Sequence, residues 1–374
     1  MTRPLLLLAA LLALPSHALA ATLSNKPGGP PWPSGVGQPQ GDFPSGVNAF
    51  EDWIGRDVDL VTAWCSQRQI QTWADFADGR CLGASYFQNA LDNYPQSTTI
   101  VISWPGMPQN GGNDGCNNNG VWDQAAAGSF DDEYLSMATG LKNLLNAHGR
   151  PPNNPNVVMR LMWEMTGCWY PWSIGTKTTQ FKQAWNRWIP IIRSQIPGIL
   201  FAFEPAHPTV WCSQGKPCTP RVDLEDILPD EANYDFIGRS LHDKGPHTTS
   251  VAAFTDNHIN QSSGEIGLAE VLAAAKAHGK KMSFSEWSAQ MVDCDAQDRA
   301  SENASAFLQG SYNFFNANSA YMGYETYFYT ACHTFHNRAG AEASILFKSL
   351  WGRTGDGSGS NDPAPTPPQQ VRVE

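Results

Sequence analysis

Two glutamates stand at the ends of apolar, β-type runs, and an aromatic residue lies beside each of them. The run V-V-M-R-L-M-W is closed by Glu164, and the run K-M-S-F-S is followed by Glu286 and Trp287. A carboxylate that ends a strand of a parallel barrel lies on the face where such folds hold their active sites. Two carboxyl groups facing each other can break a glycosidic bond, one as proton donor and one as nucleophile. The pair therefore indicates glycoside chemistry, although Glu286 taken alone could also cap a helix or lie on the surface.

Three further polar residues are candidates to support the two glutamates. Arg160 lies four residues before Glu164, and on a strand this even spacing puts both side chains on one face. We expect Arg160 to support the site, and the alternative is a buried Arg160–Glu164 ion pair. His242 is either a supporting or a structural residue. For Glu204 we favour a contact with substrate over a role as an extra titrating group.

Aromatic residues gather around both glutamates. The chain has 14 tryptophans and 10 tyrosines, and a place in the core is the first interpretation of any single tryptophan. The large number also suggests a surface that stacks on the CH faces of sugars. Trp104 ends another β-type run and could stack on a distal sugar or belong to the core. The residues expected to line sugar subsites are Trp163, Trp169, Tyr170, Trp172 and Trp287.

The chain alternates β-type runs with helical stretches, which predicts parallel βαβ units. Eight such runs favour a closed (β/α)8 TIM barrel, formed as a single domain, over an open sheet. The predicted strands are 46–50, which is the weakest, 58–64, 98–104, 156–164, 199–206, 234–242, 281–287 and 322–328. The clearest predicted helices are 131–148, 180–195, 267–278 and 299–316.

The sequence predicts neither a cofactor nor a metal. No GxGxxG, P-loop or GxSxG motif is present, so nucleotide cofactors and a serine nucleophile have no support. His207, His333 and His336 fall near strand ends, and together with Glu204 they could form a metal site. They lack the spacing of a metal motif such as HExxH, so we interpret them as ordinary loop histidines.

The two ends of the chain differ in composition from the rest. Arg3, an apolar run from Leu5 to Leu14 and the small-x-small triplet at 18–20 predict a signal peptide over residues 1–20, and hence a secreted, extracellular or periplasmic protein. Residues 21–43 are rich in Gly, Pro and Ser and predict an extended leader. The catalytic domain is predicted over 44–353, and a Gly/Ser/Pro-rich disordered tail over 354–374.

An even number of cysteines in an exported chain favours disulfides, which we expect to brace the loops of the active site. Spacing favours Cys212–Cys218, and the strand order favours Cys294–Cys332 and Cys116–Cys168. The remaining pair is Cys65–Cys81. The number of cysteines alone does not fix this connectivity.

The formal net charge of −11 argues against a nucleic acid or an anionic membrane as partner. It leaves a neutral polysaccharide or oligosaccharide as the expected partner, and we expect the protein to be a monomer.

At the two glutamate segments the sequence resembles clan A of the glycoside hydrolases, and most of all family 26, the β-mannanases. The family's fourth strand follows a pattern like R-x-x-[HW]-E-M-N-G-x-W-[FY]-x-W, and here residues 160–172 read R-L-M-W-E-M-T-G-C-W-Y-P-W. Its seventh strand ends like S-x-x-E-W-G, and here residues 283–288 read S-F-S-E-W-S. The resemblance spans most of the barrel. It implies a double-displacement mechanism with Glu164 as acid/base and Glu286 as nucleophile.

The sequence departs from the family at four places. Trp163 stands where mannanases usually have a substrate-binding His, and Thr166 stands where Asn is usual. His242 takes the place of a Tyr that often bonds the nucleophile, and Glu204 takes the place of an Asn. The resemblance implies an endo-glycanase whose first expected substrate is β-1,4-mannan from plants or microbes. Because of the four departures, a β-glucanase and a β-xylanase are kept as alternatives.

Two other functions were weighed. A non-catalytic carbohydrate-binding protein on the same barrel is disfavoured because both carboxylates are kept. A lyase for an acidic glycan is disfavoured because the chain is acidic and the motif segments hold few Lys or Arg.

Overall fold

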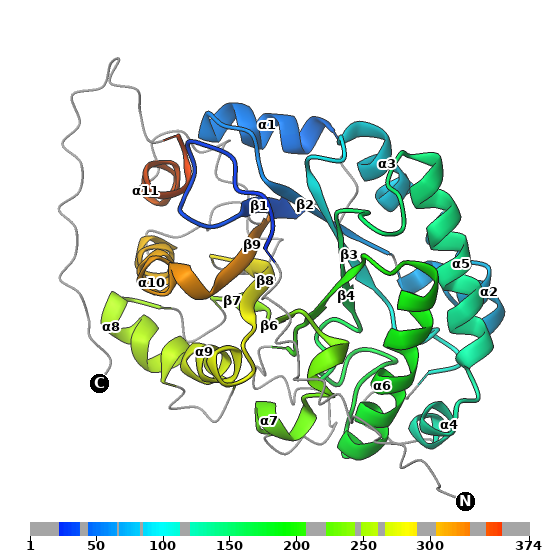
Figure 1. Ribbon diagram of the computed structural model, residues 1–374. Helices are drawn as coiled ribbons and strands as arrows, with labels where there is room; N and C mark the ends of the chain where they lie inside the picture. Colours follow the sequence, from blue (N-terminus) through cyan, green and yellow to red (C-terminus); the bar gives the residue numbers. More distant parts are fainter. Residues whose placement is uncertain are drawn as a thin grey trace, which may run out of the picture.

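The computed structural model describes residues 22–37, 44–65, 67–82, 85–112, 120–206, 222–243, 248–260, 266–289, 304–329 and 342–353. Strands occupy the centre of these residues, and helices surround them (Figure 1). The predicted signal peptide and C-terminal tail lie outside the described residues. Among the helices that are described, none is at once long enough and apolar enough to cross a bilayer.

The strands form one closed parallel sheet. Its order is β6-β5-β4-β3-β2-β1-β9-β8-β7, and a pairing of β6 with β8 closes the ring. Because β6 and β7 are two segments of one barrel strand, the result is the predicted eight-stranded barrel. The strands are β1 (Ser34–Gly37), β2 (Leu60–Trp64), β3 (Thr99–Trp104), β4 (Val157–Leu161), β5 (Leu200–Phe203), β6 (Phe236–Gly238), β7 (Leu241–His242), β8 (Lys281–Ser288) and β9 (Met322–Phe328).

The helices lie on the outside of the barrel, as the alternating pattern predicted. Helix α5 begins with three acidic residues, which favour a helix N-terminus, and Gly149 follows soon after its end. The helices are α1 (Ser45–Ile54), α2 (Trp73–Ala77), α3 (Ser85–Asn93), α4 (Val121–Ala127), α5 (Asp131–Ala147), α6 (Thr178–Gln195), α7 (Leu224–Ile227), α8 (Val251–Phe254), α9 (Leu268–Ala277), α10 (Ala304–Ala317) and α11 (Glu342–Trp351).

The first strand was predicted at the wrong place. Residues 46–50 belong to α1, whose buried residues Gly46, Val47, Phe50 and Ile54 recur at helical spacing. The first barrel strand is β1, inside the range predicted as an extended leader. Its S-G-V-G sequence has the composition of an extended leader, yet a Cβ on Gly35 would lie 2.0 Å from the carbonyl oxygen of Leu60. Glycine is therefore required by the close approach of β1 to β2.

The barrel interior changes from apolar to polar along the strands. One end is filled by an apolar cluster of Leu23, Leu60, Val101, Val158, Ala202, Phe236 and Tyr324. Side chains two residues apart on a strand share a face. The next interior layer is therefore formed by the residues two positions after the members of this apolar cluster. That layer is polar and buried, and it contains Thr62, Ser103, Arg160, Glu204 and Thr326. The polar layer directs charged groups toward the carboxyl ends of the strands.

A buried carboxylate outside the barrel holds three indole rings together. Glu325 of β9 accepts hydrogen bonds from Nε1 of Trp32 at 3.4 Å and of Trp351 at 3.1 Å, and also from Nε1 of Trp287. Burial raises the pKa of Glu325 to about 7, although hydrogen bonds from Ser34 and the indoles and the charge of Arg56 oppose the rise. The cluster links the segment just before β1, the end of β8 and helix α11.

We expect Glu325 to make the stability of the protein depend on pH. The folded pKa of about 7 lies above the ordinary value of 4.5, so the stabilisation is complete below pH 4.5 and is lost as the pH rises through 7. Glu325→Gln stays neutral over this range. The melting temperature of wild type should therefore fall relative to that of the variant between pH 4.5 and 7. Parallel curves would contradict the raised pKa.

Candidate active site

Glu164 is placed by a turn and not, as predicted, by a strand. Strand β4 ends at Leu161, and both Met162 (φ 54°) and Glu164 (φ 55°) adopt the left-handed conformation. This conformation is costly for residues with a side chain and persists where the surroundings enforce it. Here the N–H of Glu164 donates to the carbonyl oxygen of Glu204 at 3.0 Å. Its side chain keeps 7% of its surface exposed at the barrel mouth.

Glu286 points into the barrel because β8 contains a bulge. Phe284 faces outward against Phe315 of α10, and Trp287 faces outward against Trp351 of α11. The pairing of β8 with β9 shifts register between Phe284 and Trp287, so β8 carries one residue more than its partner. The extra residue lets Ser285 and Glu286 both face inward, which strict alternation would not allow.

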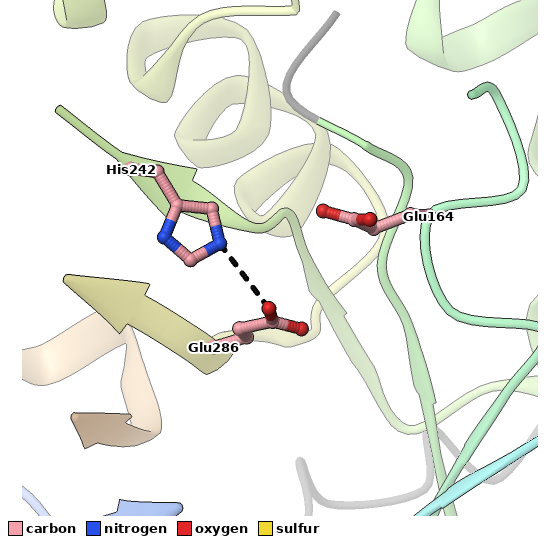
Figure 2. Close-up of side chains that lie close together, drawn as sticks. All are labelled: Glu164, His242 and Glu286. Carbon is pink, nitrogen blue, oxygen red and sulfur yellow. Dashed lines mark ion pairs between the residues drawn. The ribbon is translucent and has the colours of Figure 1, made fainter. Parts of the chain in front are cut away.

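The two glutamates meet at the mouth of the barrel, together with His242. Each of the three offers one oxygen or nitrogen atom, and these atoms lie within 4.8 Å of one another. Figure 2 shows the Glu164 carboxylate directed toward the pair formed by Glu286 and His242. Nε2 of His242 lies 3.3 Å from Oε1 of Glu286, and its Nδ1 lies 2.7 Å from Oγ of Ser288. His242 thus bridges Glu286 and the end of β8.

Arg160 binds Glu286 and not Glu164, so the alternative of an Arg160–Glu164 ion pair is wrong. Its Nη1 donates to Oε2 of Glu286 at 2.8 Å, and its Nε lies 2.8 Å from Oε2 of Glu204. Its Nη2 donates to Oγ of Ser240 at 2.6 Å. The guanidinium is fully buried, and the charges of Glu204 and Glu286 outweigh the effect of burial and raise its pKa.

These contacts keep Glu286 ionised. Burial alone would raise the pKa of its carboxyl, but the hydrogen bond from His242 and the charge of Arg160 outweigh burial and lower the pKa to about 2. Glu286 is therefore a carboxylate at any pH near neutrality, as a nucleophile or an electrostatic stabiliser must be.

Trp169 is the exposed aromatic residue of the site. The residue is 42% exposed, and its Nε1 donates to Oε2 of Glu164 at 3.1 Å. Gly167 makes this position possible, since a Cβ there would lie 2.3 Å from the indole. Tyr170 is half-buried beside it, and burial and the charges of Glu164 and Glu286 raise the pKa of its phenol.

Four other predicted subsite residues are buried and do not line an open surface. Trp163 packs edge-on against Tyr170 and Trp172. Trp172 stacks on Tyr170 at 4.5 Å and donates to the carbonyl oxygen of Trp163. Trp104 lies in the core near Phe76, and Trp287 faces the helices on the outside of the barrel. Trp163 and Trp172 thus pack against Tyr170.

Glu204, for which we favoured a contact with substrate, is fully buried behind the site. Its carboxylate accepts hydrogen bonds from N–H and Oγ of Ser285 and pairs with Arg160. Thr166, which replaces a usual Asn, accepts a hydrogen bond from the N–H of Ala206 at 3.0 Å. Glu204 therefore shapes the site without facing its open side.

Four hydroxyl groups of this network were not predicted from the sequence. They belong to Ser240, Ser285, Ser288 and Tyr324, and Oγ of Ser285 also lies 2.8 Å from the phenol oxygen of Tyr324. Small polar residues at strand ends carry no distinctive pattern. The one available signal was their position in or next to the strands that end in the candidate residues.

Glu164, His242 and Glu286 are also the residues that could hold a metal ion within the described part of the chain. The guanidinium of Arg160, 2.8 Å from Glu286, already supplies a positive partner for one of the carboxylates. His207, His333 and His336 lie outside the described residues.

One predicted disulfide is confirmed. Cys65 and Cys81 are bonded, with their Cα atoms 5.2 Å apart, and the bond closes the loop that follows β2. Cys168, just after Glu164, is also disulfide-bonded. Cys116, Cys212, Cys218, Cys294 and Cys332 lie outside the described residues, so the other three pairings remain predictions.

Solved structures share this fold. The YdhT protein from Bacillus subtilis matches with a TM-score of 0.57 at 12% identity, over 88% of this chain and 88% of that chain. The Bacillus subtilis mannanase man26 matches with a TM-score of 0.54 at 12% identity, over 90% and 92%. A GH26 β-mannanase from Bacteroides ovatus, BoMan26A, matches with a TM-score of 0.55 at 14% identity, over 86% and 88%. Neither a family model nor a curated protein matches the sequence. The chain shares its closed barrel with β-mannanases of family 26, and this confirms the fold that the family resemblance implied.

Proposed function

We propose that this protein is a secreted, retaining β-glycoside hydrolase that cleaves a β-linked polysaccharide internally. The observation that carries the proposal is the close approach of Glu164 and Glu286, with an oxygen of each within 4.8 Å of the other. Retaining enzymes hold their two carboxyl groups about 5–5.5 Å apart, whereas inverting enzymes leave room for a water at about 6.5–9.5 Å. The short separation favours retention.

The environments of the two glutamates support different roles. Glu286 is held ionised by Arg160 and His242, and it attacks the anomeric carbon as the leaving oxygen departs. Glu164 donates a proton to that oxygen, and a covalent glycosyl-enzyme forms. Glu164 then takes a proton from water, and the water oxygen displaces Glu286 from the anomeric carbon. Two inversions at that carbon give net retention.

β-1,4-Mannan is the first substrate to test, because several matching structures are described as endo-β-1,4-mannanases. Trp163 stands where the family resemblance implies a His, and it is buried against Tyr170 and Trp172. β-Glucan and xylan are therefore the next candidates. Export is proposed from residues 1–20, and N-terminal sequencing of the protein in the medium should show a start at residue 21.

The deciding experiment is a panel of β-1,4-mannan, β-glucan and xylan. Reducing-sugar release and mass analysis identify the substrate and separate internal from terminal cleavage. Proton NMR at the earliest time points reads the anomer released, and β product first is the expected result. α product first would refute retention. Binding of an oligosaccharide without cleavage of any of the three polymers would favour the non-catalytic alternative.

We expect the indole N–H of Trp169 to matter more than its ring. Trp169→Phe keeps an aromatic surface but removes the donor to Glu164, and a typical hydrogen bond within a protein contributes about 0.5–1.5 kcal/mol. kcat/KM on the identified polysaccharide should fall by roughly two- to tenfold. Tyr321→Phe is a matched control, because Tyr321 is exposed in the turn directly before β9, at the end of the barrel away from the mouth. Equal activity of Trp169→Phe and wild type would contradict this role.

A further inference from the structure

We propose that Glu204 is a positioning residue that sets the separation of Glu164 and Glu286. This inference rests on the proposed function, because it assigns those two residues to catalysis. Glu204 follows β5 directly and is fully buried, so it does not face a polysaccharide in the mouth of the barrel. Its contacts reach both candidate catalytic residues from behind.

The main chain of Glu204 holds the turn that carries Glu164. Its carbonyl oxygen accepts the N–H of Glu164 at 3.0 Å. The turn contains two left-handed residues, Met162 and Glu164, whose conformation requires support from outside the turn. Two residues beyond Glu204, the N–H of Ala206 donates to Oγ1 of Thr166 and fastens the same turn a second time.

The side chain of Glu204 holds the bulge that turns Glu286 inward. A bulge leaves a residue without its usual partner in the strand ladder. The N–H of Ser285 donates instead to the Glu204 carboxylate at 3.1 and 3.2 Å, and Oγ of Ser285 donates to Oε1 at 2.8 Å. Glu204 therefore anchors the residue that immediately precedes the nucleophile.

Glu204 also orients Arg160, which binds the proposed nucleophile Glu286. Its Oε2 lies 2.8 Å from Nε of Arg160, while Nη1 of the same guanidinium lies 2.8 Å from Oε2 of Glu286. A planar guanidinium held at one edge presents its other edge in a fixed direction. Through main chain, side chain and Arg160, one residue connects β4, β5 and β8 at the height of the catalytic pair.

The test compares Glu204→Gln, Glu204→Asp and Ser285→Ala on the polysaccharide cleaved fastest in the panel. A displacement of about 1 Å in a catalytic group can cost about a hundredfold in rate. We expect kcat to fall about tenfold or more in both Glu204 variants, with KM within about twofold of wild type, because the ground-state contacts with substrate are untouched. Ser285→Ala, which removes only the hydroxyl, should lose severalfold in kcat.

The Glu204→Asp variant separates positioning from charge balance, because it keeps the negative charge but its shorter side chain cannot make the same contacts. Wild-type kcat in Glu204→Asp would overturn the proposal, as would a change confined to KM in any of the variants. Glu51→Gln is the matched control: Glu51 accepts the N–H of Val58 at 2.8 Å before β2 begins, at the end of the barrel away from the mouth. It should keep wild-type kcat.

Folding and function are separated by two further measurements. Circular dichroism and melting curves show whether each variant folds, and if Glu204→Gln does not fold, Ser285→Ala decides alone. Unchanged kcat in Ser285→Ala would then overturn the proposal. If Glu164→Gly or Glu286→Gly keeps wild-type activity, the proposed function itself fails. If those variants are inactive and the Glu204 variants are not, only the inference about Glu204 fails.

Discussion

Glu286→Gly should lower kcat/KM on the identified polysaccharide by about 10⁴-fold or more while the protein stays folded. The reason is that Glu286, whose carboxyl is held ionised with a pKa of about 2, is the proposed nucleophile. Removing it removes the bond-forming group of the first step, which no neighbouring residue can replace. Arg160 and His242 would remain around an empty space where the carboxylate had been.

Azide distinguishes a lost nucleophile from a damaged site. On an aryl β-glycoside with a good leaving group, azide should enter the space left in Glu286→Gly and give an α-glycosyl azide after one inversion. In Glu164→Gly, the first step needs no acid with such a leaving group, so the glycosyl-enzyme forms. Azide then gives a β-glycosyl azide after two inversions.

The same anomer from both variants would refute the assignment of roles, and α product from Glu164→Gly would exchange them. Glu51→Gln, which leaves the mouth intact, serves as the folded control for both variants and should form no azide product. Full activity of either glycine variant on polysaccharide would end the glycosidase proposal.

Arg160→Met should have the second largest effect, and it should act on stability and activity together. The guanidinium is fully buried and pairs with both Glu204 and Glu286. Removing one partner of a buried ion pair typically costs about 3–5 kcal/mol, because the remaining charge is left without compensation. Here two carboxylates are left, so we expect a clear fall in the free energy of unfolding, measured by denaturant titration at pH 7.

The pH dependence gives the sign of this effect. The folded pKa of Glu286 is about 2 and its ordinary value is 4.5, so its stabilising contribution is present above pH 4.5 and is lost as the pH falls toward 2. Without Arg160 the pKa rises, and the loss begins at a higher pH. The acidic limb of kcat/KM against pH should move upward in the same direction.

Arg160→Lys is the informative companion variant. It keeps the positive charge but cannot contact Glu204, Glu286 and Ser240 at once as the guanidinium does. We expect it to recover part of the stability lost in Arg160→Met while kcat stays low. Full recovery of kcat by lysine would mean that charge alone is needed at this position. An unchanged acidic limb in Arg160→Met would contradict the role of Arg160 in holding Glu286 ionised.

The sequence by itself determined the class of fold and singled out the two candidate glutamates. Alternating β-type and helical runs predicted a closed parallel barrel, and the strands 98–104, 281–287 and 322–328 were placed within a residue of their observed ends. Local patterns succeed here because a strand covered on both faces must be apolar along its length. Glu164 and Glu286 were visible because each interrupts such a run at its end.

Tertiary structure decided which way the side chains at those ends face. Trp287 was expected in the mouth of the barrel. Because of the bulge in β8, Glu286 faces the barrel interior and Trp287 faces outward toward α11. Strand β1 was missed because its glycines, needed for contact with Leu60, resemble a loop in sequence. Glu204 was expected to touch substrate, and it instead joins Arg160 and Ser285 behind the site. The alternation of side chains along a strand assigns each residue to a face only while the strand is regular. Contacts between residues that are 80 or more positions apart in the sequence form only when the barrel closes.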